Sequence, residues 1–505
     1  MQANLDWLNK NHANLVKDLA DLVAVRSVST DGEHQKEIEQ SAELTCEQMR
    51  RAGLQKTEIL RCNGSNPYAY GEWLGAPGKP TVFLYAHHDV QPVHQADVDA
   101  GRWHSDPWKL TPREGRLFAR GSADDKAAIT AQLGAIASFL QTRGSLPVNV
   151  KIVVEGEEEV GSSNLMGFFQ QYRDKIKSDV IVVCDTENIE VGLPSITYSL
   201  RGIVTLKVEV ESATTPVHSG MAGGVLADAA LALNVILAKL YWGNGPLPVP
   251  HYYDSVRPLT AAESKTFRSL PGSEEKWRKD MGVLPGVRFA TEKGGHPHDQ
   301  TWRKPAVTII AQEASSIKGA SNQVLPRAQA LVSCRIVPDQ DPQQVFEQMR
   351  DYLTVNPPWG VKVKVEPHGS FVKWSMTDPN GPAFEAARAA MKAGFGRDPV
   401  AIGCGGTIGF VGPLAELLGG APALLLGIED PQSNAHAPDE SLHEGDWRKL
   451  MASLSHLFEN LGNLPGGQVK GQEPSATAAS KAPAPRKATG GGKTTSPKPR
   501  RGAER

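Results

Sequence analysis

Hydrophobic residues recur along this chain with two different periods, and the change of period divides it into segments. Near the N-terminus, apolar residues spaced three and four apart predict two amphipathic helices, at 5–25 and 35–52. Short β-branched runs then predict buried strands at 81–86, 148–154 and 179–184. A helix-like segment at 125–141 lies between the first two strands, and this alternation predicts an α/β layer with a mostly parallel sheet.

The pattern changes near residue 200, where apolar and polar residues begin to alternate. The segment 204–210 alternates strictly, as expected of a strand with one exposed face. A helix, two strands, a helix and a strand are then expected at 225–240, 306–312, 328–336, 342–353 and 361–365. This βαββαβ order predicts a small ferredoxin-like α+β domain. Helices and buried strands return after residue 376, which indicates one α/β domain interrupted by an inserted domain.

We therefore predict four regions. Residues 1–199 and 377–464 form the α/β domain, residues 200–376 the inserted domain, and residues 465–505 a disordered basic tail. The tail has almost no large apolar residues, so it has little surface to bury against the entropy cost of ordering. A solubilising role is the simpler interpretation of the tail, and weak contacts with nucleic acid are the alternative.

Composition narrows the possible classes of function. The chain has 505 residues and a formal net charge of −2. Outside the tail, therefore, no excess of positive charge favours nucleic acid or an anionic membrane as a partner. No apolar run of about 18 residues is present, and no membrane span is expected. The five cysteines are scattered without a Cys-x-x-Cys pair, and the N-terminus lacks the layout of a secretory signal. These features favour a reducing, cytoplasmic setting.

Acidic and imidazole side chains gather where the predicted strands and helices meet. The clusters lie at 87–92, 120–126, 155–162, 185 and 434–440. Each alone is more often a structural pair, a solvated surface or a helix cap. Ligands collect at the carboxyl ends of strands in open α/β sheets, so five such clusters are expected to converge. Carboxylates packed this closely need a cation, and a mixed set of histidine and carboxylate ligands suits a divalent metal.

The order and spacing of these motifs resemble the M20 family of dinuclear zinc peptidases, which includes carnosine-type dipeptidases, glutamate carboxypeptidases and N-acyl amino-acid deacylases. The motifs are His-x-Asp-Val-x-Pro, Gly-x-x-Asp-x-Lys, Glu-Gly-x-Glu-Glu-x-Gly-Ser and Ala-His-x-x-x-Glu, and the resemblance runs from about residue 15 to about 460. It implies a zinc-exopeptidase-like catalytic domain and an inserted lid that forms a homodimer. It also implies two divalent metal ions, Zn²⁺ with Mn²⁺ or Co²⁺ as alternatives.

The resemblance assigns roles by position in this sequence. The metal ligands that it implies are His87, Asp124, Glu159, Asp185 and His436, with Asp124 bridging the two ions. Glu158 would be the general base. Asp89 would accept the second ring N–H of His87 and so fix its tautomer. A cis peptide bond is expected between Asp124 and Asp125.

Further residues would contact the substrate. By the same resemblance, His218 would reach the active site of the partner subunit and polarise the scissile carbonyl. Arg335 would grip a substrate carboxylate with its fork of donors, and Asn322 would face the substrate. Gly406 and Thr407 belong to a loop whose backbone and hydroxyl would hold the same carboxylate.

The predicted reaction is metal-dependent hydrolysis of dipeptides or related small peptide amides. The segments 249–256 and 302–305 resemble the longer lid of dipeptidase-like members, which favours that branch. One departure is Gly403-Cys404, where dipeptidases tend to have Arg-Glu, so recognition of a free substrate amine is left unassigned. An N-acyl amino-acid deacylase using the same site is the alternative. A non-catalytic metal-binding scaffold is disfavoured, because Glu158 and all five ligands are present.

Overall fold

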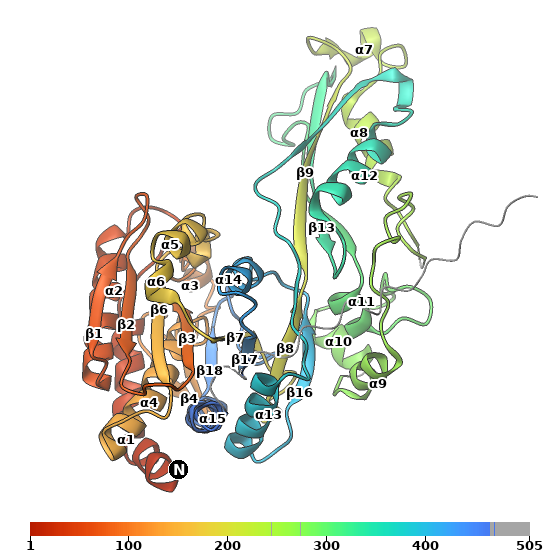
Figure 1. Cartoon of the computed structure of the whole chain (residues 1–505). Coiled ribbons are helices and arrows are strands. Elements are labelled where there is room, and N and C mark those ends of the chain that lie inside the picture. The colour runs from red at the N-terminus through yellow and green to blue at the C-terminus, as the bar shows by residue number, and fades with distance from the viewer. Residues whose placement is uncertain (244, 273, 465–468, 470–505) are drawn as a thin grey trace, which may run out of the picture. The chain divides into compact units, whose positions relative to one another are not determined.

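The computed structural model describes residues 1–243, 245–272, 274–464 and 469. Its largest sheet has nine strands in the order β1-β2-β6-β3-β7-β17-β8-β15, with β16 paired to β8 (Figure 1). The bounds are β1 (Lys56–Leu60), β2 (Tyr68–Trp73), β3 (Thr81–His87), β6 (Asn149–Glu155), β7 (Val180–Glu187), β8 (Ser195–Leu200), β15 (Ser375–Met376), β16 (Val400–Cys404) and β17 (Ala423–Glu429). The central strands β6, β3, β7 and β17 run parallel, which confirms the predicted α/β class.

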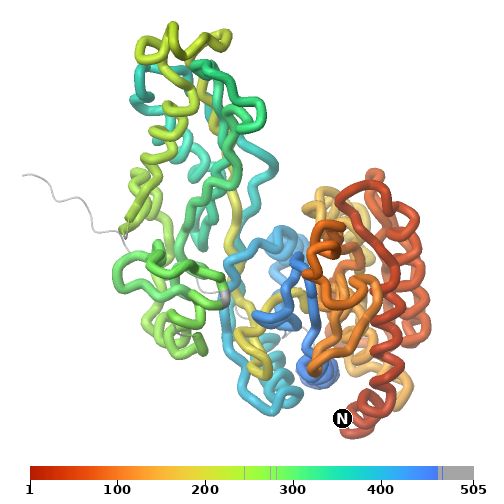
Figure 2. The backbone as a smooth tube through the Cα atoms, turned by 180° about the vertical axis from the view of Figure 1, so that it is seen from behind, coloured from red at the N-terminus to blue at the C-terminus, as the bar shows by residue number. Residues whose placement is uncertain are grey.

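Helices cover both faces of this sheet, because its central strands are apolar on both sides. In β3, Val82 and Leu84 belong to one core and Phe83 and Tyr85 to another. The first core is covered by α1 (Gln2–Val23), α2 (Gln35–Ala52), α4 (Lys126–Arg143), α13 (Pro382–Phe395) and α15 (Glu444–Gly462), and the second by α5 (Leu165–Gln171), α6 (Arg173–Ile176) and α14 (Val411–Leu417). Helices α1 and α15 lie side by side although they come from opposite ends of the described chain (Figure 2).

A second sheet is antiparallel and has the order β11-β13-β9-β14. Its strands are β9 (Gly202–Glu211), β11 (Ala306–Glu313), β13 (Arg327–Ile336) and β14 (Lys362–Pro367), and α8 (Ala229–Ala238) and α12 (Pro342–Thr354) pack on it. Strand β9 alternates buried and half-buried residues along its whole length, as its sequence predicts. The βαββαβ order and the ferredoxin-like class are confirmed. Helix α8 begins at Ala229 rather than 225, because the Asp228 side chain caps it by accepting from the Leu231 N–H at 2.8 Å.

The segment 241–305 has no clear period in the sequence, and its described residues, all but 244 and 273, form three short helices. These are α9 (Ala261–Ser269), α10 (Glu274–Asp280) and α11 (Pro297–Arg303). Helix α11 packs closely on β16, since a Cβ at Gly403 would lie 2.6 Å from the Cβ of Trp302. Tertiary contact therefore holds a segment whose own sequence carries little helical signal.

Smaller elements complete the described chain. They are α3 (Gln95–Asp99), α7 (Ser219–Ala222), the 3₁₀ turns η1 (Glu158–Val160) and η2 (Pro358–Gly360), the pair β10 (Val217–His218) and β12 (Gln323–Val324), and the sheet of β4 (Thr111–Arg113), β5 (Arg116–Phe118) and β18 (Ser441–His443). A membrane-crossing helix, long and apolar enough for the purpose, is absent from the described residues. Apart from Val469, the predicted tail 465–505 lies outside them.

Candidate active site

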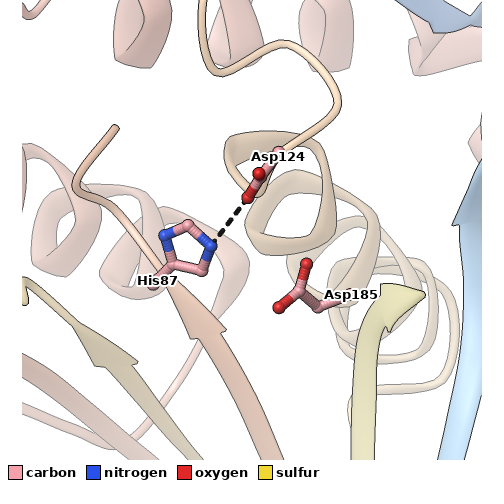
Figure 3. Close-up of side chains that lie close together, drawn as sticks. All are labelled: His87, Asp124 and Asp185. Atoms are coloured by element: carbon pink, nitrogen blue, oxygen red, sulfur yellow. Dashed lines mark hydrogen bonds and ion pairs between the residues drawn. The ribbon is translucent and has the colours of Figure 1, made fainter. Parts of the chain in front are cut away.

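The predicted site residues meet at the carboxyl edge of the large sheet. His87 is the last residue of β3, Asp185 lies near the end of β7, and η1 with Glu158 and Glu159 follows β6 directly. Because β6, β3 and β7 are parallel neighbours, their ends lie side by side. Asp124 precedes α4, so the turn into that helix brings it to the same edge (Figure 3).

The side chains form two groups that share Asp124. One oxygen of Asp124 lies 2.9 Å from Nε2 of His87, and the other lies 2.9 Å from Nε2 of His436. Nε2 of His436 also lies 3.1 Å from Oε2 of Glu159. In each group, His87 with Asp124 and Asp185, or Asp124 with Glu159 and His436, the ligand atoms all lie within 4.8 Å of one another. All five predicted ligands are therefore brought together, with Asp124 between the groups.

The electrostatics of this edge indicate an excess of negative charge. Burial and the charge of Asp124 together raise the pKa of Asp185 to about 7. Burial, with a contribution from the charge of Asp185, likewise raises the pKa of Glu158 to about 8. The hydrogen bond to Asp124 raises the pKa of His436 to about 11. Imidazole nitrogens and carboxylate oxygens in two overlapping groups fit a pair of divalent transition-metal ions, whose charge would offset this repulsion.

Glu440 holds the loop that carries Asp124. Its carboxylate accepts four hydrogen bonds at 2.6–3.1 Å, from Arg120 Nη1 and from the backbone N–H groups of Gly121, Ala123 and Asp124. Glu440 closes the Ala-His-x-x-x-Glu motif, but sequence reasoning assigned it no role. The expected cis peptide bond between Asp124 and Asp125 is present in the same loop.

Comparison with known proteins identifies the family. A family model described as Peptidase family M20/M25/M40 matches residues 83–460. This chain belongs to that family. The cysteinylglycine-S-conjugate dipeptidase of Corynebacterium striatum is 30% identical over 437 residues, which cover 86% of this chain and 92% of that protein.

Two solved structures have the same fold as this M20 chain. The crystal structure of human carnosine dipeptidase 1 is 25% identical, has a TM-score of 0.77, and the match covers 92% of this chain and 99% of that one. An M20 family metallo-carboxypeptidase from Sulfolobus solfataricus is 27% identical with a TM-score of 0.76, over 89% of this chain and 99% of that one. The relatives of this M20 protein thus include dipeptidases and a carboxypeptidase.

Asp89 of this M20 chain contacts more than the histidine for which it was predicted. Nδ1 of His87 lies 3.0 Å from the backbone carbonyl oxygen of Asp89 and 3.5 Å from its carboxylate, so the carbonyl is the nearer acceptor. The carboxylate instead accepts the N–H groups of Glu158 at 3.2 Å and Glu159 at 3.0 Å, and the hydroxyl of Ser29 at 2.7 Å. Its side chain therefore caps the turn η1, while its backbone fixes the His87 ring with Nε2 toward Asp124.

The loop after β16 of the M20 domain positions two arginines. The Thr407 hydroxyl accepts from Arg335 Nη1 at 2.8 Å and donates to the Arg201 carbonyl at 2.6 Å, while Arg201 Nε donates to the Gly405 carbonyl at 3.0 Å. Burial and the positive charge of Arg335 together lower the pKa of Arg201 to about 10. Within the described chain, neither guanidinium pairs with a carboxylate. Sequence reasoning missed Arg201, since no motif marks it.

This arrangement changes the roles expected of the loop. The Thr407 hydroxyl proton is already donated to a carbonyl, and the Gly406 N–H points to Cys404 Sγ at 3.3 Å. Both predicted donors thus have partners within the protein, and Thr407 orients Arg335. The positive charge beside the loop comes from the guanidinium groups of Arg201 and Arg335.

His218 and Asn322 lie together at the separate two-stranded sheet of β10 and β12, outside both ligand groups. His218 ends β10, which pairs with β12 just after Asn322, and the Asn322 carbonyl accepts the Ser219 N–H at 2.8 Å. Nδ1 of His218 accepts the Gly220 N–H at 3.0 Å, at the start of α7. Figure 1 shows α7 at one end of the sheet that contains β9.

Proposed function

We propose that this M20 chain hydrolyses the amide bond of dipeptides in a metal-dependent reaction. The observation that carries the proposal is the Asp124 carboxylate shared by two histidine–carboxylate groups, with Glu158 beside them. The dipeptidases among its relatives support this class of substrate. Two divalent ions would be held by His87, Asp124, Glu159, Asp185 and His436, with Zn²⁺ as the first candidate and Mn²⁺ or Co²⁺ as alternatives.

Such a pair of ions supplies Lewis-acid chemistry and lowers the pKa of water. The residues of this chain supply the proton transfers. A Glu158 carboxylate oxygen takes the proton from the attacking water and later delivers it to the nitrogen of the leaving amine. The raised pKa of Glu158, about 8, lies close to neutral pH, and such a pKa lets the same carboxyl group both take up and release a proton. Asp89 holds the backbone of Glu158 in place, because its carboxylate accepts the Glu158 N–H.

The two arginines supply recognition of the carboxyl terminus. Arg335 and Arg201 have no carboxylate partner within the described residues, and a planar fork of donors suits a carboxylate. A site that binds one free carboxylate favours an exopeptidase acting on short substrates over an endopeptidase.

The inserted sheet supports the proposal of a homodimer. Strand β11 is an edge strand and exposes Ile309 and Ile310, and α8 exposes Leu231 and Val235. Packing of this face on a second copy would bury them. Because Nδ1 of His218 accepts a hydrogen bond, the neutral ring carries its proton on Nε2, which could donate to a substrate carbonyl in the partner's site. Five free cysteines agree with the proposed cytoplasmic location.

The first test is metal removal and replacement. The protein would be stripped with a chelator, reloaded with Zn²⁺, Mn²⁺ or Co²⁺ in turn, and assayed on dipeptides beside N-acetyl and N-succinyl amino acids. Metal-dependent release of free amino acids from dipeptides is expected. Cleavage of the acylated compounds alone would instead show that the protein is a deacylase. That activity is the alternative because Cys404 stands where dipeptidases tend to have a glutamate.

The second test removes the proposed base. Glu158→Gln should abolish turnover yet leave two metals bound, because the base is not a ligand. Glu416→Gln is the matched control, since Glu416 has a side chain that is 78% exposed on α14. His218→Ala should lower the rate without loss of metal. Full activity of Glu158→Gln would contradict the mechanism.

A further inference from the structure

A cavity of about 280 Å³ lies at the end of β7, where Glu187, two residues after Asp185, forms part of its wall. Its walls come from the end of β7, from the loop that follows β16, and from the α10–α11 region of the inserted segment. The residues that matter below are Glu187, Asn188, Thr197, Trp277, His298 and Trp302. The cavity is thus bounded on one side by the strand that carries Asp185. Its size falls near the lower limit of small-ligand sites, which begin at about 300 Å³.

Glu187 brings an unpaired negative charge to this cavity. It lies two residues after Asp185 on β7, so the two side chains point to the same side of the strand, roughly 7 Å apart along it. The burial pattern agrees, because Thr186 between them is buried while Asp185 and Glu187 are more open. Among the described residues, no hydrogen bond or ion pair engages the Glu187 carboxylate. The neighbouring Asp430 pairs with Arg116.

The cavity wall also contains buried polar groups without partners. Among the described residues, Asn188 Nδ2, Thr197 Oγ1 and both ring nitrogens of His298 find no hydrogen-bond partner, although their residues are 1%, 1% and 4% exposed. The Pro271 carbonyl acts on the His298 ring without hydrogen-bond geometry, and burial lowers the pKa of His298 to about 4, so the ring is neutral. Buried polar groups in native proteins are almost always satisfied, so a ligand or water completes this wall.

Aromatic rings form the remaining surface. The His298 ring stacks on Trp302 with centroids 4.2 Å apart, and Trp277 meets it edge-on at 5.2 Å. Trp302 is fixed by its close contact with Gly403. Such a surface suits a side chain with a flat apolar face.

We infer that this cavity binds the amino-terminal residue of the substrate, with Glu187 accepting hydrogen bonds from its free ammonium group and Trp277 and Trp302 packing on its side chain. The inference rests on the proposed hydrolysis of dipeptides. A dipeptide is a zwitterion, and the 403–407 loop borders both the cavity with Glu187 and the unpaired guanidinium groups of Arg201 and Arg335. Charge complementarity therefore sets the direction in which the substrate binds.

The spacing agrees with this direction. The α-amino nitrogen of a dipeptide is two bonds from the scissile carbonyl carbon. A carboxylate on the same strand face as the metal ligand Asp185, and about 7 Å along the strand, can reach that nitrogen while the carbonyl lies at the metal groups. The charge of Glu187 also acts on the Cys404 thiol, which places both residues around one space.

The test compares phenylalanyl-glycine with 3-phenylpropionyl-glycine, which differ only in the ammonium group. In Glu187→Gln the ratio of kcat/KM for the first compound to that for the second should fall about 10- to 100-fold, the range for loss of a charge-assisted hydrogen bond. Glu190→Gln is the matched control. Glu190 lies three residues further on, pairs with Arg397 at 3.3 Å and does not line the cavity, so the ratio should hold.

Two further variants test the direction and the side-chain contact. Lys276 also lines the cavity. Lys276→Met should raise kcat/KM for phenylalanyl-glycine if an ammonium group binds there, and lower it if a carboxylate does. Trp277→Ala should reduce the preference for phenylalanyl-glycine over alanyl-glycine about 10-fold, since truncating a buried aromatic contact costs apolar surface.

Each remaining outcome has a defined meaning. An equal fall for both compounds in Glu187→Gln, or no fall, would overturn the inference and indicate that water fills the cavity. A lower rate of Lys276→Met on phenylalanyl-glycine would reverse the assigned direction. If the metal-loaded wild-type protein hydrolyses neither compound nor any other dipeptide, the proposed function itself fails, and this assignment fails with it.

Discussion

Replacement of Asp89 by asparagine should lower turnover while both metals stay bound. In the structure the two carboxylate oxygens accept the N–H groups of Glu158 and Glu159 at 3.2 and 3.0 Å. Asparagine has the same shape but turns an NH₂ group toward one of these donors. One charge-assisted hydrogen bond is then lost, and the turn η1 shifts. His87 keeps its acceptor, because the backbone carbonyl at 3.0 Å does not depend on the side chain.

The magnitude follows from that single bond. A hydrogen bond to a charged group contributes about 1.5–3 kcal/mol, and about 1.4 kcal/mol corresponds to a tenfold change, so kcat should fall about 10- to 100-fold. Ser29→Ala is the matched control, since it removes only the hydroxyl that donates to the same carboxylate at 2.7 Å. Both N–H groups of η1 keep their acceptors in this variant, so its loss of kcat should be smaller than that of Asp89→Asn. The assays are steady-state hydrolysis of a dipeptide and metal content of the desalted protein by mass spectrometry.

Metal content decides between two roles for Asp89. If Asp89→Asn retains two metals and loses kcat, its side chain acts through the turn that holds Glu158. If the variant instead loses one metal and recovers full activity in excess Zn²⁺, the carboxylate acts through His87. The reasoning from the 3.0 and 3.5 Å distances would then be refuted.

Three other changes follow from the geometry. Glu440→Gln should lower the free energy of unfolding by about 3–5 kcal/mol, because buried Arg120 loses its charged partner at 2.6 Å; urea unfolding of the metal-free protein measures this, and an unchanged midpoint would contradict it. Metal binding should release protons, because the pKa of His436, about 11 when paired with Asp124, must be overcome before its nitrogen can ligate. Apparent metal affinity should therefore rise from pH 6 to pH 8, and calorimetry in buffers of different ionisation enthalpy measures how many protons are released. A metal affinity that does not change with pH would contradict a protonated His436 paired with Asp124 in the metal-free protein. Gly405→Ala should raise KM more than it lowers kcat, because its Cβ would lie 2.9 Å from Arg201 Nη2; equal effects on both would argue against a binding role for Arg201.

The convergence of the ligands could be predicted from sequence because it depends on general rules of α/β sheets. His87 and Asp185 each end or nearly end a β-branched run, and parallel neighbours bring such ends to one edge. The resemblance to the M20 motifs then assigned Glu159 as a ligand and Glu158 as the base. The start of α8 was less predictable, because Val225 and Leu226 continue the apolar pattern while Asp228 caps the helix. The segment 241–305 gave no period, since α11 is held by Trp302 against Gly403 rather than by its own propensity.

Arg201 and Glu187 were beyond sequence reasoning for a different reason. A charged residue in a sequence is by default a solvated or paired group, and its availability to a substrate depends on whether a partner lies within about 4 Å. That is decided by contacts between distant segments: Arg201 meets the 405–407 loop, and Glu187 faces α10 and α11. Both charges are left unpaired around one loop, with opposite signs. An enzyme that selects small zwitterions needs one negative and one positive group at separate places in its site. A substrate that lacks either charged end then leaves the matching group of the protein without a partner, and it binds less tightly.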